Sequence, residues 1–187
     1  MLRVAPSLET APTHTVAGLQ ELYQQLLHTK VYHHRKACMS GNADERCRMC
    51  GKTFESVGHT LAGCSAIAPT QYLARHNKAL KILFFEMLRP LGLITTTAPW
   101  YSQAQAKPMY ENDRVVAYWD VPMLADSTHV KANRIDARLM DKERKEVRLL
   151  DMSCLRVENR DEKAVENNSK YGPLRCELQQ RHPDYTL

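Results

Sequence analysis

The sequence predicts an α/β protein of the α+β type, in which helices come first and strands follow. Apolar residues between 17 and 29 and between 70 and 88 recur at the three- and four-residue spacing of amphipathic helices. From residue 115 onward the spacing changes to that of strands. The chain has 187 residues, of which 43% are hydrophobic and 25% charged, an ordinary composition for a globular protein. This length is sufficient for a buried core but not for a large multidomain enzyme.

The N-terminal part of the chain is predicted to be helical, with polar segments between the helices. Pro90 and Gly92 end the last of these helices, and the Thr, Pro, Gln and Asn residues of 94–113 indicate a loop. We expect a domain border near residues 90–113. The predicted elements are, in order, a tail over 1–15, a helix over 17–29, a polar and basic connector over 31–46, a compact unit over 47–64 and a helix over 70–88.

The C-terminal part is predicted to contain strands followed by helix. A charged turn over 141–146 separates the last two strands, so we expect these to pair as a hairpin. Gly172 and Pro173 should interrupt the final helix, because proline lacks a backbone N–H. The expected elements are strands over 115–119, 133–140 and 147–151, a helix over 161–170 and a short helix over 173–181.

Several classes of protein are excluded by composition. The longest uninterrupted apolar run is 115–119, far short of the roughly 20 residues needed to cross a bilayer, so we expect no membrane span. The N-terminus lacks the apolar stretch of a signal peptide, so we expect a protein that is not secreted and is nuclear or otherwise cytoplasmic. In that reducing setting the 6 cysteines are thiols or metal ligands. The 7 glycines form neither a dinucleotide-binding motif nor a P-loop.

Basic residues are concentrated in the first half of the chain. Residues 1–100 carry 11 Lys and Arg against 6 Asp and Glu, whereas residues 101–187 carry 15 of each. Such an excess is typical of a protein with a polyanionic partner, either DNA or RNA, although a solvated charged face has the same composition. The candidate nucleic-acid contacts in this region are Lys36, Arg46, Arg48 and Lys52.

A metal site is predicted by the spacing of three cysteines and a histidine. Cys47 and Cys50 form a C-x2-C turn that places two sulfurs on one side, and His59 and Cys64 add two ligands about one helical turn apart. Three thiolates and one imidazole suit a structural Zn²⁺ with no open position. Gly51 follows the second cysteine, where such a turn often requires a positive φ. Four residues spaced by chance are the alternative.

A second, partial metal site is an open alternative further upstream. Cys38 lies close in sequence to His33 and His34, and all three also suit a solvated connector.

Two carboxylates mark a second candidate site. Fourteen residues separate Asp136 from Asp151, and a hairpin of that length brings both to one side of a sheet. Converging carboxylate oxygens suit Mg²⁺, which polarises a phosphodiester and activates a water molecule. Aspartate is also common at strand ends, so the spacing alone is a weak signal.

Taken in order, these motifs resemble a family. The C-C-H-C knuckle, Arg75-His76-Asn77, Tyr118-Trp119-Asp120, Asp-x14-Asp and Lys170-Tyr171 are similar to the C-terminal region of non-LTR retrotransposon polyproteins, between about residues 31 and 184. In that family a reverse transcriptase is followed by a zinc knuckle and a restriction-like endonuclease of the PD-(D/E)xK fold, which nicks DNA.

The resemblance implies roles for residues and regions of this chain. It makes Asp136 and Asp151 the catalytic metal ligands. It places Arg75 and His76 on a helix beside the knuckle, where they either contact nucleic acid or belong to an exposed helical face. The implied organisation is a tail and helix over 1–30, a basic segment with knuckle and helix over 31–92, and a partial endonuclease domain over 113–187.

The chain departs from the family at its lysine. The family motif Glu-Lys-x-x-Lys-Tyr aligns with 166–171, so that Asn167 stands where the first lysine is expected. An amide cannot supply the positive charge that stabilises a phosphorane transition state. Lys163 and Lys170, each about one helical turn away, are the candidate substitutes. The family also reads Arg-Pro-Asp at 134–136 and continues through further strands, so the resemblance implies a truncated copy.

Three functions follow as hypotheses. The first is a zinc-containing, nucleic-acid-binding remnant of a retrotransposon endonuclease with weak or no cleavage. The second is an active Mg²⁺-dependent DNA-nicking endonuclease. The third is a zinc-stabilised protein-interaction module without a nucleic-acid role. The basic first half favours nucleic acid over the third.

Overall fold

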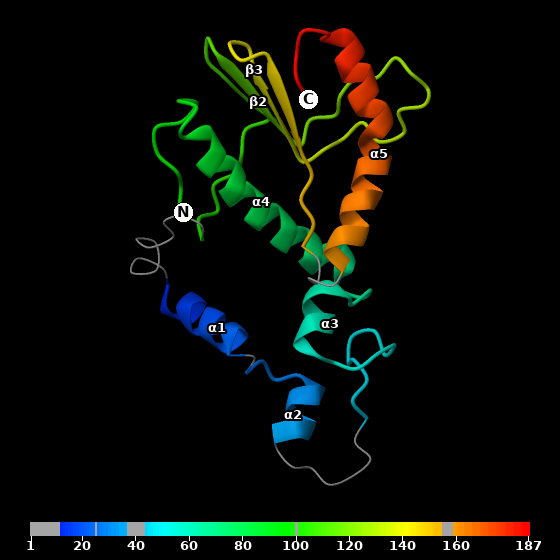
Figure 1. Ribbon diagram of the computed structural model, residues 1–187. Helices are drawn as coiled ribbons and strands as arrows, with labels where there is room; N and C mark the ends of the chain where they lie inside the picture. Colours follow the sequence, from blue (N-terminus) through cyan, green and yellow to red (C-terminus); the bar gives the residue numbers. More distant parts are fainter. Residues whose placement is uncertain (1–11, 25, 37–43, 100, 155–158) are drawn as a thin grey trace. The chain divides into compact units, whose positions relative to one another are not determined.

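A computed structural model of the protein describes residues 12–24, 26–36, 44–99, 101–154 and 159–187 (Figure 1). Contacts divide the chain into two compact units. The first unit comprises Met1–Arg75 with Pro99–Tyr101, and the second comprises His76–Ala98 with Ser102–Leu187. We expected the border near residues 90–113, whereas the division of the contacts falls inside a helix, whose residues Phe84, Phe85 and Leu88 pack in one cluster with strand residues.

The first unit consists of short helices around the cysteine-rich segment. Its helices are α1 (Thr13–Tyr23), α2 (Lys30–Lys36), α3 (Val57–Ala62) and a π-helical turn η1 (Ala68–Tyr72), which leads into α4 (Leu73–Leu88). The helix expected over 17–29 corresponds to α1, which starts earlier, at Thr13, and ends earlier, at Tyr23.

Helix α2 lies where the sequence predicts only a polar connector. The hydroxyl of Thr29, a buried residue, accepts a hydrogen bond from Tyr32 N–H (3.2 Å) and caps this helix. Lys30 N–H donates to the Glu55 carboxylate (3.2 Å). These two acceptors satisfy N–H groups that a helix end otherwise leaves open, and so they stabilise a helix of only seven residues.

The second unit contains a four-stranded antiparallel sheet in the order β1-β2-β3-β4. The strands are β1 (Met109–Glu111), β2 (Val115–Trp119), β3 (Ala137–Asp141) and β4 (Glu146–Leu150), and helix α5 (Arg160–Arg181) follows them. The predicted α+β class is confirmed, and so is the hairpin of the last two strands. Strand β1 falls within the expected loop over 94–113, and β3 begins four residues later than the strand expected over 133–140.

Helices α4 and α5 cover opposite faces of this sheet. Phe84 and Leu88 of α4 pack against Ala137 and Leu139 of β3, with Leu150 at the edge of the cluster. A second cluster joins the sheet to α5, and Leu149 packs on it. Adjacent strand residues point to opposite faces of a sheet. Because Leu150 packs with the α4 cluster and Leu149 with the α5 cluster, the two helices lie on opposite faces. The residues of the second cluster are Met123, Ile135, Tyr171, Leu174 and Leu178.

Helix α5 continues through Pro173, contrary to the predicted break. Proline removes one N–H donor from the helix. Tyr171 and Leu174, on either side of it, are both buried in the cluster against the sheet. Packing of both halves on one surface compensates for the lost hydrogen bond. Over the described parts of the chain, no helix is both long enough and apolar enough to cross a membrane.

The turn between β3 and β4 is organised by Asp141, the last residue of β3. Its carboxylate accepts from Arg114 Nη2 (2.8 Å) and from the backbone N–H groups of Glu143 (3.1 Å) and Arg144 (2.9 Å). These hydrogen bonds, that of Arg114 first, lower the pKa of Asp141 to about 2. The carboxylate therefore holds the turn in its ionised form.

We predict that Asp141→Asn lowers the free energy of unfolding by about 1 kcal/mol at neutral pH, because the amide loses the charged hydrogen bond to Arg114. The folded-state pKa is depressed, so the contribution is present above the unfolded value and is lost as pH falls toward about 2. Urea titrations from pH 7 down to about 3 measure this. The control is Asp184→Asn, which breaks the exposed pair with Lys145. Equal stability losses in both variants would contradict the role of Asp141.

Candidate functional site

The four predicted zinc ligands come together in the first unit. Their ligating atoms all lie within 4.8 Å of one another. Cys47 Sγ and Cys64 Sγ are 3.8 Å apart, and Cys50 Sγ is 3.3 Å from His59 Nε2. Two sulfurs bound to one tetrahedral Zn²⁺ with Zn–S bonds of about 2.3 Å lie about 3.8 Å apart. The cluster can therefore hold a metal ion such as zinc, and its members are Cys47, Cys50, His59 and Cys64.

A tight turn sets the positions of the first two cysteines. Gly51 N–H donates to Cys47 O (2.7 Å), and Cys47 N–H donates to Thr53 O (2.7 Å). Gly51 has φ of 67°, as the sequence predicted for the residue after the second cysteine. A substitution at Gly51 would meet backbone strain rather than a steric clash, because nothing lies within 4 Å of an added Cβ.

Helix α3 supplies the histidine ligand. Ser56 caps the helix, with its hydroxyl accepting from His59 N–H (3.1 Å). His59 is buried, as are Cys47 and Cys64. The cap fixes the first turn of α3 and with it the direction of the imidazole.

Glu55 is a structural residue of this unit that the sequence analysis missed. It is only 4% exposed, and its carboxylate accepts from Arg48 N–H (2.8 Å), from the Arg48 side chain and from Lys30 N–H. The hydrogen bond from the Arg48 side chain is the main reason why the pKa of Glu55 is lowered. Glu55 thus ties α2 to the cysteine turn, and an acidic residue in a basic segment was the available signal.

The surroundings of Cys47 lower the pKa of its thiol. Burial opposes its ionisation, but backbone N–H groups of Cys50 and Met49 and the neighbouring His59 outweigh it and lower the pKa of Cys47 to about 7. Metal ligation requires the thiolate, so this environment favours the ligand form.

The hairpin of the second unit brings the two predicted carboxylates together. In the β3–β4 register Ala137 pairs with Leu150, so one further step places Asp136 opposite Asp151. Residues opposite each other across an antiparallel pair point to the same face. The nearby charge of Asp151 contributes to the pKa of Asp136, which burial, the larger effect, also raises.

Asp136 is held by groups from both sides of the site. Its Oδ2 accepts from Met152 N–H (2.7 Å) and lies 3.3 Å from His76 Nε2. His76 Nε2 also donates to Met152 O (2.7 Å), so one residue links the imidazole and the carboxylate through its own peptide groups. Burial opposes protonation of His76, but hydrogen bonds to Asn77 and Met152 and the charge of Asp136 raise its pKa.

Asp151 is held by helix α5. Its Oδ2 accepts from Asn167 Nδ2 (2.7 Å), and its Oδ1 accepts from the Tyr171 hydroxyl (2.6 Å). The Lys170 ammonium donates to the same hydroxyl (2.7 Å). Burial, followed by the contact with Asp151, raises the pKa of Tyr171.

The two candidate lysines are placed differently. Lys170 reaches Asp151 through the Tyr171 hydroxyl. Lys163 instead pairs with Glu166 (2.7 Å) on the same helix. Among the described residues, Lys170 is the one of the two that is connected to the acidic pair by hydrogen bonds.

The predicted nucleic-acid residues occupy different environments. Lys36, Arg46 and Lys52 are exposed, although Arg46 pairs with Asp44 (2.9 Å), and Arg48 pairs with Glu55. The Arg75 guanidinium lies over the Tyr72 ring, 5.4 Å from its centre. His76 is buried, and its Nε2 lies close to the Asp136 carboxylate. Its contact with nucleic acid stays a prediction. Cys38 lies outside the described residues.

Comparison of the chain with protein families, curated proteins and solved structures finds no match.

We predict that Cys50→Ser abolishes zinc binding, because a hydroxyl cannot replace a thiolate at a soft tetrahedral site. Purified wild-type chain should carry about one zinc ion, measured by atomic emission, and the variant should carry almost none. The matched control is Cys176→Ser, which changes an exposed cysteine on α5. Zinc content unaffected by Cys50→Ser would show that the cluster is not the metal site.

Proposed function

We propose that this chain is a zinc-containing nucleic-acid-binding protein related to retrotransposon endonucleases, with weak or no cleavage of its own. In this proposal Zn²⁺ is structural and holds the knuckle of the first unit. The second unit is taken to be similar to a PD-(D/E)xK nuclease domain, in which Asp136 and Asp151 would hold Mg²⁺.

The observation that carries the proposal is the environment of Asn167. Its Nδ2 donates to Asp151, at the position where the resembling family carries a lysine. Its Oδ1 is buried and has no hydrogen-bond partner among the described residues. An unsatisfied buried acceptor costs about 1–3 kcal/mol. A lysine has donors and no acceptor, so the position suits an ammonium better than the amide it contains.

The charge distribution supports the binding function. The net excess of basic residues lies entirely in residues 1–100, which include the knuckle. Lys36 and Lys52 are exposed there. Phosphates attract such a surface irrespective of base sequence, and the resulting affinity falls with salt.

Lys170 favours a second candidate function, an active Mg²⁺-dependent nicking enzyme. Its ammonium lies one hydroxyl away from Asp151, through Tyr171. A small movement of the side chain would bring a cation to the acidic pair, where positive charge stabilises the pentavalent transition state.

The test of the proposal is nicking of supercoiled plasmid in Mg²⁺ or Mn²⁺. We predict that Asn167→Lys nicks, that wild type is much slower, and that adding Asp136→Ala abolishes the gain, because the metal then loses a ligand. The control variant is Asn168→Lys, which adds the same charge at an exposed position of α5.

Other outcomes decide between the candidates. Nicking by wild type that disappears in Asp136→Ala and in Lys170→Gln would establish the active enzyme. If neither wild type nor any variant nicks the plasmid while zinc content and helix content are intact, nuclease chemistry has to be removed from the proposal. An equal gain in Asn168→Lys would mean that added charge on α5, rather than the position of Asn167, is responsible.

Nucleic-acid binding has its own measurement. We predict that the logarithm of the affinity for duplex DNA falls linearly with the logarithm of the salt concentration. Asp151→Ala should leave this affinity nearly unchanged, because Asp151 would hold metal and not DNA. A slope near zero would favour the third hypothesis, an interaction module without nucleic acid.

A further inference from the structure

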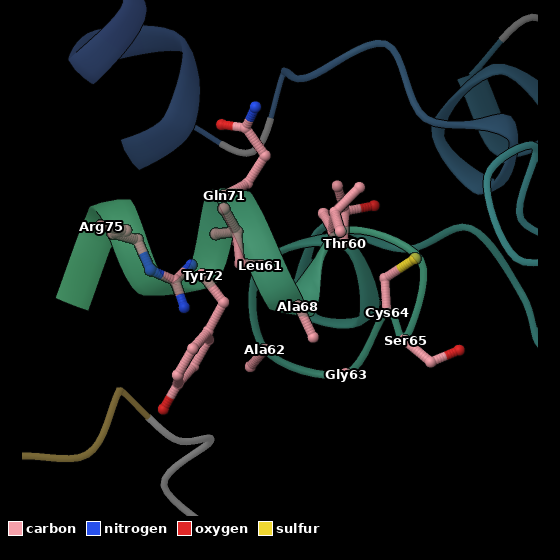
Figure 2. A pocket seen from close by; sticks show the side chains of 11 residues that line it. Thr60, Leu61, Ala62, Gly63, Cys64, Ser65, Ala68, Gln71, Tyr72 and Arg75 are labelled. Carbon is pink, nitrogen blue, oxygen red and sulfur yellow. The ribbon is translucent and has the colours of Figure 1, made fainter.

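A cavity of about 410 Å³ lies in the first unit beside the metal cluster. Its wall runs from the end of α3 through the turn that carries Cys64, and then along η1 to the start of α4 (Figure 2). This volume is within the range of about 300–1,000 Å³ that is usual for small-molecule sites. The proposed function does not use this cavity.

Small side chains and one aromatic ring define its shape. Ala62, Gly63 and Ala68 line it and leave room, while Tyr72 supplies a flat face. In Figure 2 the Tyr72 ring projects from its helix on the side where Ala62 lies, with the Arg75 guanidinium group near it. The guanidinium lies over the ring at 5.4 Å from its centre.

The chemistry of the lining suits a flat ring with an attached anion. The described residues that line the cavity include Arg75 but no Asp or Glu. Guanidinium groups bind phosphate through paired N–H donors and can stack on a ring at the same time.

We propose that this cavity binds one unpaired nucleobase of single-stranded nucleic acid, with the base against Tyr72 and the adjoining phosphate on Arg75. A paired base in a duplex is stacked on its neighbours and must leave the stack before it can enter such a cavity. The cavity therefore gives the chain a preference for unpaired strands. This inference rests on the proposed nucleic-acid binding and names the form of nucleic acid that is bound.

The cavity is linked to the metal cluster through a shared turn. Cys64 O accepts from the N–H groups of Ile67 (3.3 Å) and Ala68 (3.1 Å), so the residue that supplies a ligand also anchors the start of η1. Tyr72 is the last residue of η1. Metal at the cluster would fix the wall that carries the aromatic ring.

The experiment compares two fluorescent single strands of about 12 nucleotides, oligothymidine and an abasic strand with the same phosphates. We expect Tyr72→Ala to weaken oligothymidine binding about tenfold and to leave abasic-strand binding unchanged, because only the base contact is lost. Tyr72→Phe keeps the ring and should retain wild-type affinity. Arg75→Gln should weaken both strands and reduce the salt slope by about 0.7.

Two further variants separate the cavity from other causes. Tyr23→Ala removes a ring that is 91% exposed in the same unit and should change neither affinity. Ala68→Leu narrows the cavity while Tyr72 stays, and should weaken oligothymidine alone. It replaces Tyr72→Ala as the decisive variant if the latter loses zinc.

The two proposals fail in different ways. If the chain binds both strands and the ratio of their affinities is the same in wild type, Tyr72→Ala and Ala68→Leu, the base site is wrong and nucleic-acid binding stands. If wild type binds neither strand nor duplex DNA at low salt, the proposed function and the base site are both wrong.

Discussion

The pairing of β3 with β4 is the constraint on which the second unit depends. Its register places Asp136 opposite Asp151. It also places Leu150 in the cluster that contains residues of α4, and Leu149 in the cluster that contains residues of α5. A shift of one residue would exchange the faces of a whole strand. Asp141 holds the turn that fixes this register through Arg114 and two backbone N–H groups. Core packing and the acidic pair are therefore consequences of one hairpin.

The first unit depends on a different kind of constraint. Its described buried apolar residues are Cys47 and Cys64, both members of the metal cluster, and its other buried residues are the polar Thr29, Glu55 and His59. Burial of apolar surface cannot supply much folding free energy to such a unit. Metal binding can, because ligation free energy becomes folding free energy when no site exists in the unfolded chain. The Glu55 carboxylate connects α2 to the cysteine turn, because it accepts hydrogen bonds from Lys30 N–H and from Arg48 N–H.

Local sequence patterns predicted what depends on spacing and missed what depends on distant packing. The metal cluster, the φ of Gly51 and the final hairpin follow from short-range rules, and all are present. The break expected at Pro173 is wrong because burial of Tyr171 and Leu174 keeps α5 continuous. The contact of Glu55 with Lys30 spans 25 residues of the chain and that of His76 with Met152 spans 76, and no local pattern encodes those distances.

The two carboxylates of the acidic pair differ in how their charge is compensated. Asp136 lies 3.3 Å from the His76 imidazole, whose raised pKa favours its protonated form. Asp151 faces Asn167 and Tyr171, which are neutral donors, and the nearest ammonium, that of Lys170, lies beyond the tyrosine hydroxyl. Neutral hydrogen bonds compensate a buried charge less well than charged ones. Asp151 receives these hydrogen bonds from neutral donors, and one of them, the Asn167 amide, has an oxygen without a hydrogen-bond partner among the described residues. A cation at position 167 would place a positive charge beside Asp151 and remove the unsatisfied oxygen with one side chain, which is why the proposed function depends most on this residue.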